Sequence, residues 1–343
     1  MRSILVIRFS SLGDVILSTP IVRQLQRTYP DVMLDVATSS RFHEVYQHNP
    51  RVRTAWSVDP APTADSEMDD VKLSMKESLP DGEYDLIVDL QSNVRSAAFR
   101  HNLGSTVVRA PKHRMEKLAL VWLKKRPAVI TPIVARYRST IEHLPLALDT
   151  DGPEVWLPTE RVDGVYGPSS RLVRPLPTSD LHVAVAPGAQ HATKRWPVAK
   201  VAALCERLLR EGARVTLIGG PADVPICDAI AAAVGGAVDR ADGATSLAQT
   251  IAVLDRANVL VSMDSGAMHL GAARQVPTVA IFGSTVKELG FAPYGVRHQI
   301  VDHDVRCRPC SHIGRSKCPK GHFLCMEGID VEQVLAAIRK LTA

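Results

Sequence analysis

The chain has 343 residues, more than one typical hydrophobic core holds, so we expect two domains. Its 45% hydrophobic and 22% charged residues are typical of a globular protein in water, and no run of about 18 apolar residues predicts a membrane span. The first residues, MRSILVIRFSSLGD, lack the long apolar core of a signal peptide, which predicts a cytoplasmic protein.

The chain begins with an expected strand, loop and helix. Residues 3–8 are an almost continuous apolar run, as in a buried parallel strand, and residues 15–28 follow the pattern of an amphipathic helix. Ser11 and Gly13 lie in the loop between them, and Asp14 stands where the helix starts. The G-x-G-x-x-G spacing of a dinucleotide loop is absent. Asp14 is therefore either a helix cap or a functional carboxylate at the end of a strand.

Further strands are expected at residues 33–38, 54–58 and 84–90. The polar stretch 60–80 contains several acids, and we expect it to be a mobile loop. Asn93 and Arg95 follow the last of these strands, so both are candidates to face a ligand cleft at its carboxyl end.

Positive charge is concentrated in residues 95–138, where eleven Lys and Arg accompany a single acid. Such a segment is either a solvated face or a surface for a polyanion. Aromatic residues are few and no nucleic-acid motif is present, which favours a phosphorylated glycolipid or an anionic membrane over nucleic acid. One cluster within it is Lys124, Lys125 and Arg126. It follows the apolar run 118–123, which predicts either an interfacial helix or a core helix with a basic end.

The second half begins after residues 149–180, a stretch rich in proline and glycine that we interpret as a linker. The loop after the next strand, PGAQHATKRWP, places Lys194 and Arg195 between a strand and a helix. There they either bind a phosphate or form a charged surface loop. The following strand, 214–218, ends near Asp223, which is placed to hydrogen-bond a ribose.

The stretch 258–285 is typical of a strand–loop–helix–strand unit of a parallel sheet. Asp264, Ser265 and Gly266 lie at the carboxyl end of its first strand, the edge at which open sheets bind ligands. The helix start suits a diphosphate, and Asp264 suits sugar hydroxyls. His269 falls on the first helical turn. The alternative is that Asp264 or Ser265 only caps the helix and that His269 is a surface residue.

The motifs SSLGDVILSTP, PGA…TKRWP, DSGAMHLGAA…PTVAIFGST and CRPC…G…CP…H…CM occur in this order over nearly the whole chain. Together they resemble the family 9 glycosyltransferases, the ADP-heptose:lipopolysaccharide heptosyltransferases. The resemblance implies an α/β protein of the GT-B fold, with two doubly wound Rossmann-like domains facing a cleft. Residues 1–165 would bind the acceptor and residues 166–328 the nucleotide-sugar donor. Residues 329–343 would form a helix that packs back on the N-terminal domain.

The resemblance also implies a reaction, the inverting transfer of heptose from ADP-heptose to the inner core of lipopolysaccharide. The acceptor would be Kdo-lipid A or heptosyl-Kdo-lipid A. Asp14 matches the family's proposed general base, Lys194 its lysine at the diphosphate and Asp264 its aspartate at the heptose hydroxyls. Ser265 and Gly266 match its backbone contacts to the diphosphate.

Arg195, Asp223 and His269 complete the expected donor site, His269 matching the family's helix histidine. The expected acceptor contacts are Ser11, Gly13, Asn93, Arg95, Lys124, Lys125 and Arg126. The partners would be an ADP-sugar, a phosphorylated glycolipid and the anionic inner face of the inner membrane, on which a cytoplasmic enzyme would be peripheral. The loop QHATKRWP is not identical to that of either major heptosyltransferase subtype, which leaves the acceptor and the exact sugar open.

Two other functions stay open on the same scaffold. A GT-B sugar-nucleotide epimerase would use the donor without an acceptor and would need further acids near the sugar. A non-catalytic protein that binds a nucleotide-sugar or a glycolipid would not need Asp14.

No cofactor is expected. The strings D-x-D at residues 149–151 and 302–304 hold a divalent cation in other glycosyltransferases, but short acidic strings are common by chance. Lys194, Arg195 and the helix dipole can neutralise the diphosphate instead, so we expect no catalytic Mg²⁺.

Cysteines are unevenly distributed: Cys307, Cys310, Cys318 and Cys325 lie within 19 residues. C-x2-C is a half-site typical of zinc, but its partner, C-x6-C, does not have a standard spacing. A disulfide is disfavoured in the cytoplasm. The spacing therefore favours a reduced cluster that orders a loop over a zinc site.

Overall fold

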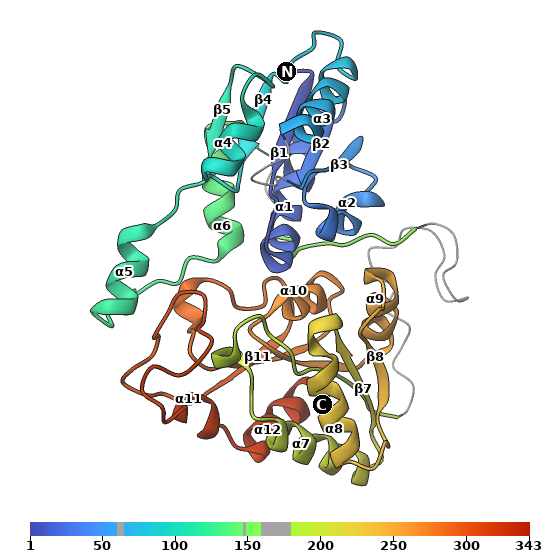
Figure 1. Ribbon diagram of the computed structural model, residues 1–343, viewed down its shortest axis with the longest axis vertical. Coiled ribbons are helices and arrows are strands. Elements are labelled where there is room, and N and C mark those ends of the chain that lie inside the picture. Colours follow the sequence, from blue (N-terminus) through green and yellow to red (C-terminus); the bar gives the residue numbers. More distant parts are fainter. Residues whose placement is uncertain (60–64, 147–148, 159–179) are drawn as a thin grey trace. The chain divides into compact units, whose positions relative to one another are not determined.

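The computed structural model describes residues 1–59, 65–146, 149–158 and 180–343. The chain folds into two compact units (Figure 1), of which unit 1 contains Met1–Lys112 and Ile133–Pro158, and unit 2 contains His113–Pro132 and Thr159–Ala343. None of the helices described is long and apolar enough to cross a membrane. The domain boundary expected between residues 165 and 166 lies outside the described residues.

Unit 1 is built on a parallel sheet with the strand order β3-β2-β1-β4-β5. Its strands are β1 (Ser3–Ile7), β2 (Met33–Thr38), β3 (Thr54–Ser57), β4 (Leu86–Asp89) and β5 (Val107–Arg109). Its helices are α1 (Leu12–Thr28), α2 (Glu44–Gln47), α3 (Asp65–Glu77), α4 (Val94–Arg100) and α6 (Ile133–Arg138). All residues of the central strand β1 are buried, which explains its continuous apolar sequence.

Two elements of unit 1 differ from the expectation. Helix α1 begins at Leu12 and continues through Pro20, so Asp14 lies within its first turn. The expected mobile loop contains helix α3 instead, while residues 60–64 lie outside the described residues. The helical stretch has Met75 in the same apolar cluster as Leu5 of β1. The mostly polar sequence of this stretch does not predict a helix. Packing against the core of unit 1 stabilises it.

Arg23 ties helix α1 to the segment that closes unit 1. Its guanidinium is fully buried and binds the carboxylates of Asp149 (2.9 Å) and Glu154 (2.8 Å). It also donates to the backbone carbonyls of Asp151 and Gly152. The first D-x-D string thus contains a structural ion-pair partner, Asp149, whose charge Arg23 already balances.

Unit 2 is built on a parallel sheet with the strand order β11-β10-β9-β6-β7-β8. Its strands are β6 (His182–Ala186), β7 (Arg214–Gly219), β8 (Asp239–Asp242), β9 (Val259–Met263), β10 (Thr278–Phe282) and β11 (His298–Asp302). Its helices are α5 (Arg114–Trp122), α7 (Val198–Arg210), α8 (Val224–Ala233), α9 (Leu247–Arg256), α10 (Gly266–Ala273), α11 (Leu324–Glu327) and α12 (Val331–Thr342).

Helix α12 belongs to unit 2, whereas the sequence analysis predicted that residues 329–343 pack on the N-terminal domain. It contacts β9, β10, β11 and α7. Val334, Leu335, Ile338 and Leu341 are buried in the apolar core of this unit. Their spacing makes one continuous apolar face, and the sheet of unit 2 covers it.

The basic segment is divided between the two units. Residues 113–132 cluster with unit 2, although we expected them on the acceptor domain. Leu120 of helix α5 is buried against Val286, Leu289 and Phe291. This apolar cluster thus ties α5 to unit 2.

Each sheet has one point at which the strand order reverses. In unit 1 it lies between β1 and β4, and in unit 2 between β6 and β9. Loops that leave the carboxyl ends of two such strands diverge to opposite faces and leave a crevice where ligands bind in α/β proteins. The residues that follow these four strands are therefore the candidates for function.

Candidate active site

The switch point of unit 1 carries Asp14, in the first turn of α1. Its Oδ2 accepts hydrogen bonds from the backbone N (3.3 Å) and Oγ (2.9 Å) of Ser11, the residue that precedes the helix. Asp14 is thus the third helical residue of a capping box whose N-cap residue is Ser11. Its side chain is 17% exposed.

Two further groups fix the charge of Asp14. Arg8 Nη2 lies 2.9 Å from Oδ1, and the Tyr137 hydroxyl donates a hydrogen bond of 2.9 Å to the same oxygen. Burial alone would raise the pKa of Asp14, but the charge of Arg8 and the hydrogen bonds from Ser11 and Tyr137 together lower it below its usual value. The carboxylate is therefore ionised at neutral pH. Burial raises the pKa of Tyr137, so its phenol remains a donor.

Gln91 joins the two loops of this switch point. Its Oε1 accepts hydrogen bonds from the backbone N of Phe9 (3.2 Å) and Ser10 (3.3 Å). Arg8 Nη1 donates to the Leu90 carbonyl at 2.7 Å. Sequence reasoning missed Arg8, Tyr137 and Gln91. Arg8 directly follows a buried strand and offered a signal, whereas Tyr137 lies far away in the chain and offered none.

The expected acceptor residues fall into separate places. Ser11 and Gly13 adjoin Asp14 in the first turn of α1. Asn93 caps helix α4, its Oδ1 accepting from the Ser96 backbone N at 3.0 Å. Arg95 is exposed on the same helix. The cap explains Asn93 without a ligand.

Lys124 and Arg126 bind other parts of unit 2. Lys124 Nζ donates to the carbonyls of Cys307 (3.2 Å) and Pro309 (2.7 Å). Arg126 Nη2 lies 2.6 Å from Asp304, in the second D-x-D string. Both side chains thus hold α5 to the loop after β11. Lys125 is exposed.

The switch point of unit 2 carries a second carboxylate with a cation and a hydroxyl. Lys194, from the loop after β6, lies 2.8 Å from Asp264 Oδ2, after β9. The Thr285 hydroxyl, after β10, donates to the same oxygen at 2.6 Å. Only 7% of Asp264 is exposed. Asp264 is therefore held by side chains from the loops after β6 and β10, the two strands that flank β9.

Helix α10 begins beside this carboxylate. Ser265 is its N-cap residue but makes no side-chain capping bond, and Gly266 is its first residue. The first backbone N–H groups of a helix lack partners within it and attract an anion. His269 is buried, with its ring 6.2 Å from that of Phe291, so the surface alternative for this residue is wrong.

Arg195 and Asp223 support neighbouring loops. Arg195 Nε donates to the Ala189 carbonyl at 2.8 Å, within the loop after β6. Asp223 Oδ2 accepts from the Gly220 backbone N at 3.0 Å. A Cβ at Gly188 would lie 2.0 Å from Asp223 Oδ1, so this position requires glycine. The close approach places Asp223 over the end of β6, at the expected ligand-binding edge.

The family model for glycosyltransferase family 9 (heptosyltransferase) matches residues 72–320. The chain belongs to glycosyltransferase family 9. This family 9 protein is 28% identical to lipopolysaccharide heptosyltransferase 1 of Pseudomonas aeruginosa over 315 residues, which is 90% of this chain and 85% of that one. As a member of the family, it is a glycosyltransferase.

Solved structures confirm the GT-B fold of this glycosyltransferase. A family 9 glycosyltransferase from Veillonella parvula aligns with a TM-score of 0.76 at 19% identity, covering 99% of this chain and 97% of that chain. The Escherichia coli ADP-heptose lipopolysaccharide heptosyltransferase II aligns with a TM-score of 0.72 at 22% identity, covering 100% and 98%.

The ionised state of Asp14 in this glycosyltransferase can be tested through Tyr137→Phe. The variant removes one donor from the carboxylate, so the pKa of Asp14 in the folded protein should rise toward its usual value. A carboxylate with a lowered folded-state pKa stabilises the fold above its usual pKa, and this contribution is lost as pH falls through the folded-state pKa. The difference in unfolding free energy between the wild type and the variant should therefore be largest at neutral pH. It should become smaller as the pH falls. Urea unfolding at several pH values measures it.

Tyr46→Phe is the matched control. The Tyr46 hydroxyl bonds Ser18 Oγ (2.7 Å) and the Val15 carbonyl (3.4 Å), neither of which titrates in this range. Loss of the Tyr46 hydroxyl should therefore lower the free energy of unfolding by the same amount at every pH. A Tyr137→Phe cost that is equally independent of pH would contradict the assigned electrostatics of Asp14.

Proposed function

We propose that this glycosyltransferase transfers heptose from ADP-heptose to the inner core of lipopolysaccharide, with inversion at the anomeric carbon. The main support is the Lys194–Asp264 ion pair beside the start of helix α10, at the switch point of unit 2. The relatives support the substrates, since one is named a lipopolysaccharide heptosyltransferase and another an ADP-heptose lipopolysaccharide heptosyltransferase. The acceptor is Kdo-lipid A or its heptosylated form.

Unit 2 binds the donor in this proposal. The first N–H groups of α10, at Ser265 and Gly266, and the ammonium of Lys194 neutralise the diphosphate as it leaves. Lys194 and Thr285 both contact Oδ2 of Asp264, so Oδ1 can accept a hydrogen bond from a sugar hydroxyl. Asp223, at the neighbouring strand end, accepts from the ribose. These groups supply the charge compensation without a metal ion.

Asp14 is the general base in this proposal. As the acceptor oxygen bonds to the anomeric carbon, the bond from that carbon to ADP breaks and the hydroxyl proton passes to the Asp14 carboxylate. Because the pKa of Asp14 is lowered, the carboxylate is a weak base and contributes mainly by orienting the hydroxyl. Ser11 and Gly13 form the adjacent backbone.

Asp14→Asn tests the base. The variant keeps the shape of the side chain and loses the proton acceptor, so turnover should fall roughly 10²- to 10⁴-fold with ADP-heptose affinity nearly unchanged. Mass spectrometry of a heptose-deficient lipid A core incubated with ADP-heptose measures the transfer. Asp31→Asn, an exposed carboxylate after α1, is the control and should keep wild-type turnover.

The same assay separates the alternatives. Near-normal turnover of Asp14→Asn would reject Asp14 as the base but would not contradict the proposed heptose transfer. A wild-type protein that binds ADP-heptose without turnover would be a binding protein. One that alters the donor sugar without an acceptor would be an epimerase.

The donor contacts predict a contrast between two variants. Asp264→Ala should weaken ADP-heptose binding more than ADP binding, because only the sugar contact is lost and Lys194 remains. Lys194→Met should weaken both ligands alike, because both carry the diphosphate. Calorimetry with each ligand measures the four affinities. Equal losses for ADP and ADP-heptose in Asp264→Ala would reduce Asp264 to a partner that only positions Lys194.

In this proposal the enzyme acts at the cytoplasmic surface of the inner membrane. Helix α5 and the residues after it expose Met115 (77%), Trp122 (76%), Leu123 (75%) and Val129 (78%). Exposed apolar side chains of this size in one short segment mark an interaction surface. Arg114, Lys117 and Lys125 lie in the same segment, and cations beside apolar side chains suit an anionic bilayer surface.

Replacing Trp122 and Leu123 by Ser should therefore weaken sedimentation with vesicles that contain anionic lipid. The matched control replaces Leu73 and Val94, which are exposed apolar residues of unit 1, by Ser. It should bind like the wild type. Binding of the wild type should also fall with rising salt, since each cation near the surface contributes about 1 kcal/mol that salt screens. Equal vesicle binding by both double variants would exclude α5 as the membrane contact.

A further inference from the structure

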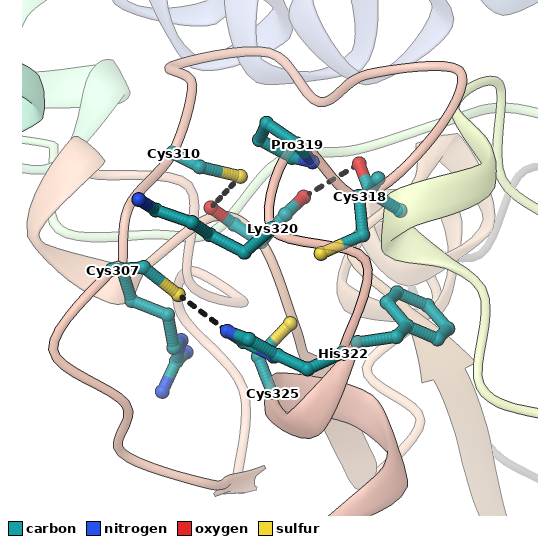
Figure 2. Close-up of a pocket in the computed structure, with 11 residues that line it drawn as sticks. Cys307, Cys310, Cys318, Pro319, Lys320, His322 and Cys325 are labelled. Atoms are coloured by element: carbon teal, nitrogen blue, oxygen red, sulfur yellow. Dashed lines mark hydrogen bonds between the residues drawn. The ribbon is translucent and has the colours of Figure 1, made fainter.

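Four cysteines that the proposed reaction does not use surround one pocket in unit 2. Cys307, Cys310, Cys318 and Cys325 all line it (Figure 2). Cys325 lies in the short helix α11, and the other three lie in the stretch between β11 and α11, which has no helix or strand. The two sequence half-sites, C-x2-C and C-x6-C, therefore meet at one place although their spacing is not standard.

Two cations line the same pocket, Arg308 and Lys320. Arg308 is buried and is fixed by the carbonyls of Gly283 (2.6 Å) and Phe282 (3.1 Å). A fixed positive charge in the wall of the pocket offsets part of the negative charge that thiolate ligands would bring to a metal ion.

His322 is placed as a hydrogen-bond donor to this cluster. Its Nδ1 accepts from the Leu324 backbone N at 3.1 Å, which leaves the proton of the neutral ring on Nε2. Nε2 lies 3.8 Å from the Cys307 sulfur, so His322 donates toward that sulfur. A donor in this position supports a ligating sulfur without being a ligand itself.

We propose that Cys307, Cys310, Cys318 and Cys325 bind one thiophilic transition-metal ion, zinc or iron, in a tetrahedral site. Four sulfur ligands are the donor set that both ions share. Among the described residues, no three His, Cys, Asp or Glu side chains already have the arrangement of a metal site, so the sulfurs turn inward as the ion binds. Binding displaces the protons of the ligating thiols.

The ion would order the loop that supports the donor site. The Cys310 backbone N donates to the Ser284 carbonyl at 3.2 Å, and Ser284 Oγ donates to Thr193 Oγ1 at 2.9 Å. Thr193 precedes Lys194, and its Oγ1 also accepts from the Arg315 backbone N at 2.8 Å. Loss of the ion should therefore loosen the loop that carries Lys194. The site itself does not depend on the proposed reaction, and its test does not measure that reaction.

The test begins with tag-free wild-type protein, purified under reducing conditions and analysed by inductively coupled plasma mass spectrometry. About one zinc or iron per chain is expected. Iron would give the visible charge-transfer bands of an iron–thiolate centre. Zinc is colourless, and replacing it by Co²⁺ should give the absorption of tetrahedral cobalt thiolate. In the holoprotein, a chelator should make four thiols newly reactive toward a thiol reagent.

Variants assign the ligands. Cys318→Ser and Cys307→Ser should each reduce the metal content to less than about one tenth of the wild-type value. Cys205→Ala, which changes a buried cysteine of α7, is the control and should keep the ion. Two results would overturn the proposal: apoprotein that takes up no zinc, iron or Co²⁺ under reducing conditions, or a Cys318→Ser protein that keeps the wild-type metal content. The wild-type measurements stand even if a variant does not fold.

Discussion

A carboxylate held by one cation and one hydroxyl at the switch point of each parallel sheet is the constraint on which the rest of the structure depends. Asp14 is held by Arg8 and the Tyr137 hydroxyl, and Asp264 by Lys194 and the Thr285 hydroxyl. A largely buried carboxylate without such partners would be protonated or would destabilise the fold. Each unit therefore places one cation and one hydroxyl beside its carboxylate, and in the proposed reaction the two carboxylates have different tasks.

The carboxylate of unit 2 is supported by several further layers of contacts. Thr193 lies in the loop that carries Lys194, and its hydroxyl accepts a hydrogen bond of 2.9 Å from the Ser284 hydroxyl. Arg308 donates to the Thr285 carbonyl at 3.0 Å and so holds the residue whose hydroxyl contacts Asp264. Both supports lie against the cysteine pocket. The proposed metal ion would thus stabilise the loop that carries Lys194 and would take no part in the transfer reaction.

The sequence predicted those parts of the protein that local pattern determines. Buried parallel strands are apolar runs, so the central strands of both sheets could be located, and with them Asp14, Lys194 and Asp264 at the strand ends. Contacts between distant residues could not be predicted: Tyr137 reaches Asp14 across 123 residues, and Arg126 reaches Asp304 across 178. For the same reason the sequence did not indicate that α12 and residues 113–132 belong to unit 2. An amphipathic pattern shows that a face is buried but not against which unit.

A crystal structure of the protein with a non-transferable ADP-heptose analogue tests the central claim most directly. The account predicts the diphosphate at the start of α10, with its oxygens within hydrogen-bond distance of Lys194 and of the first backbone N–H groups. It also predicts a heptose hydroxyl at Asp264. A diphosphate bound instead at the start of α1, beside Arg8 and Asp14, would contradict the division of tasks between the two carboxylates.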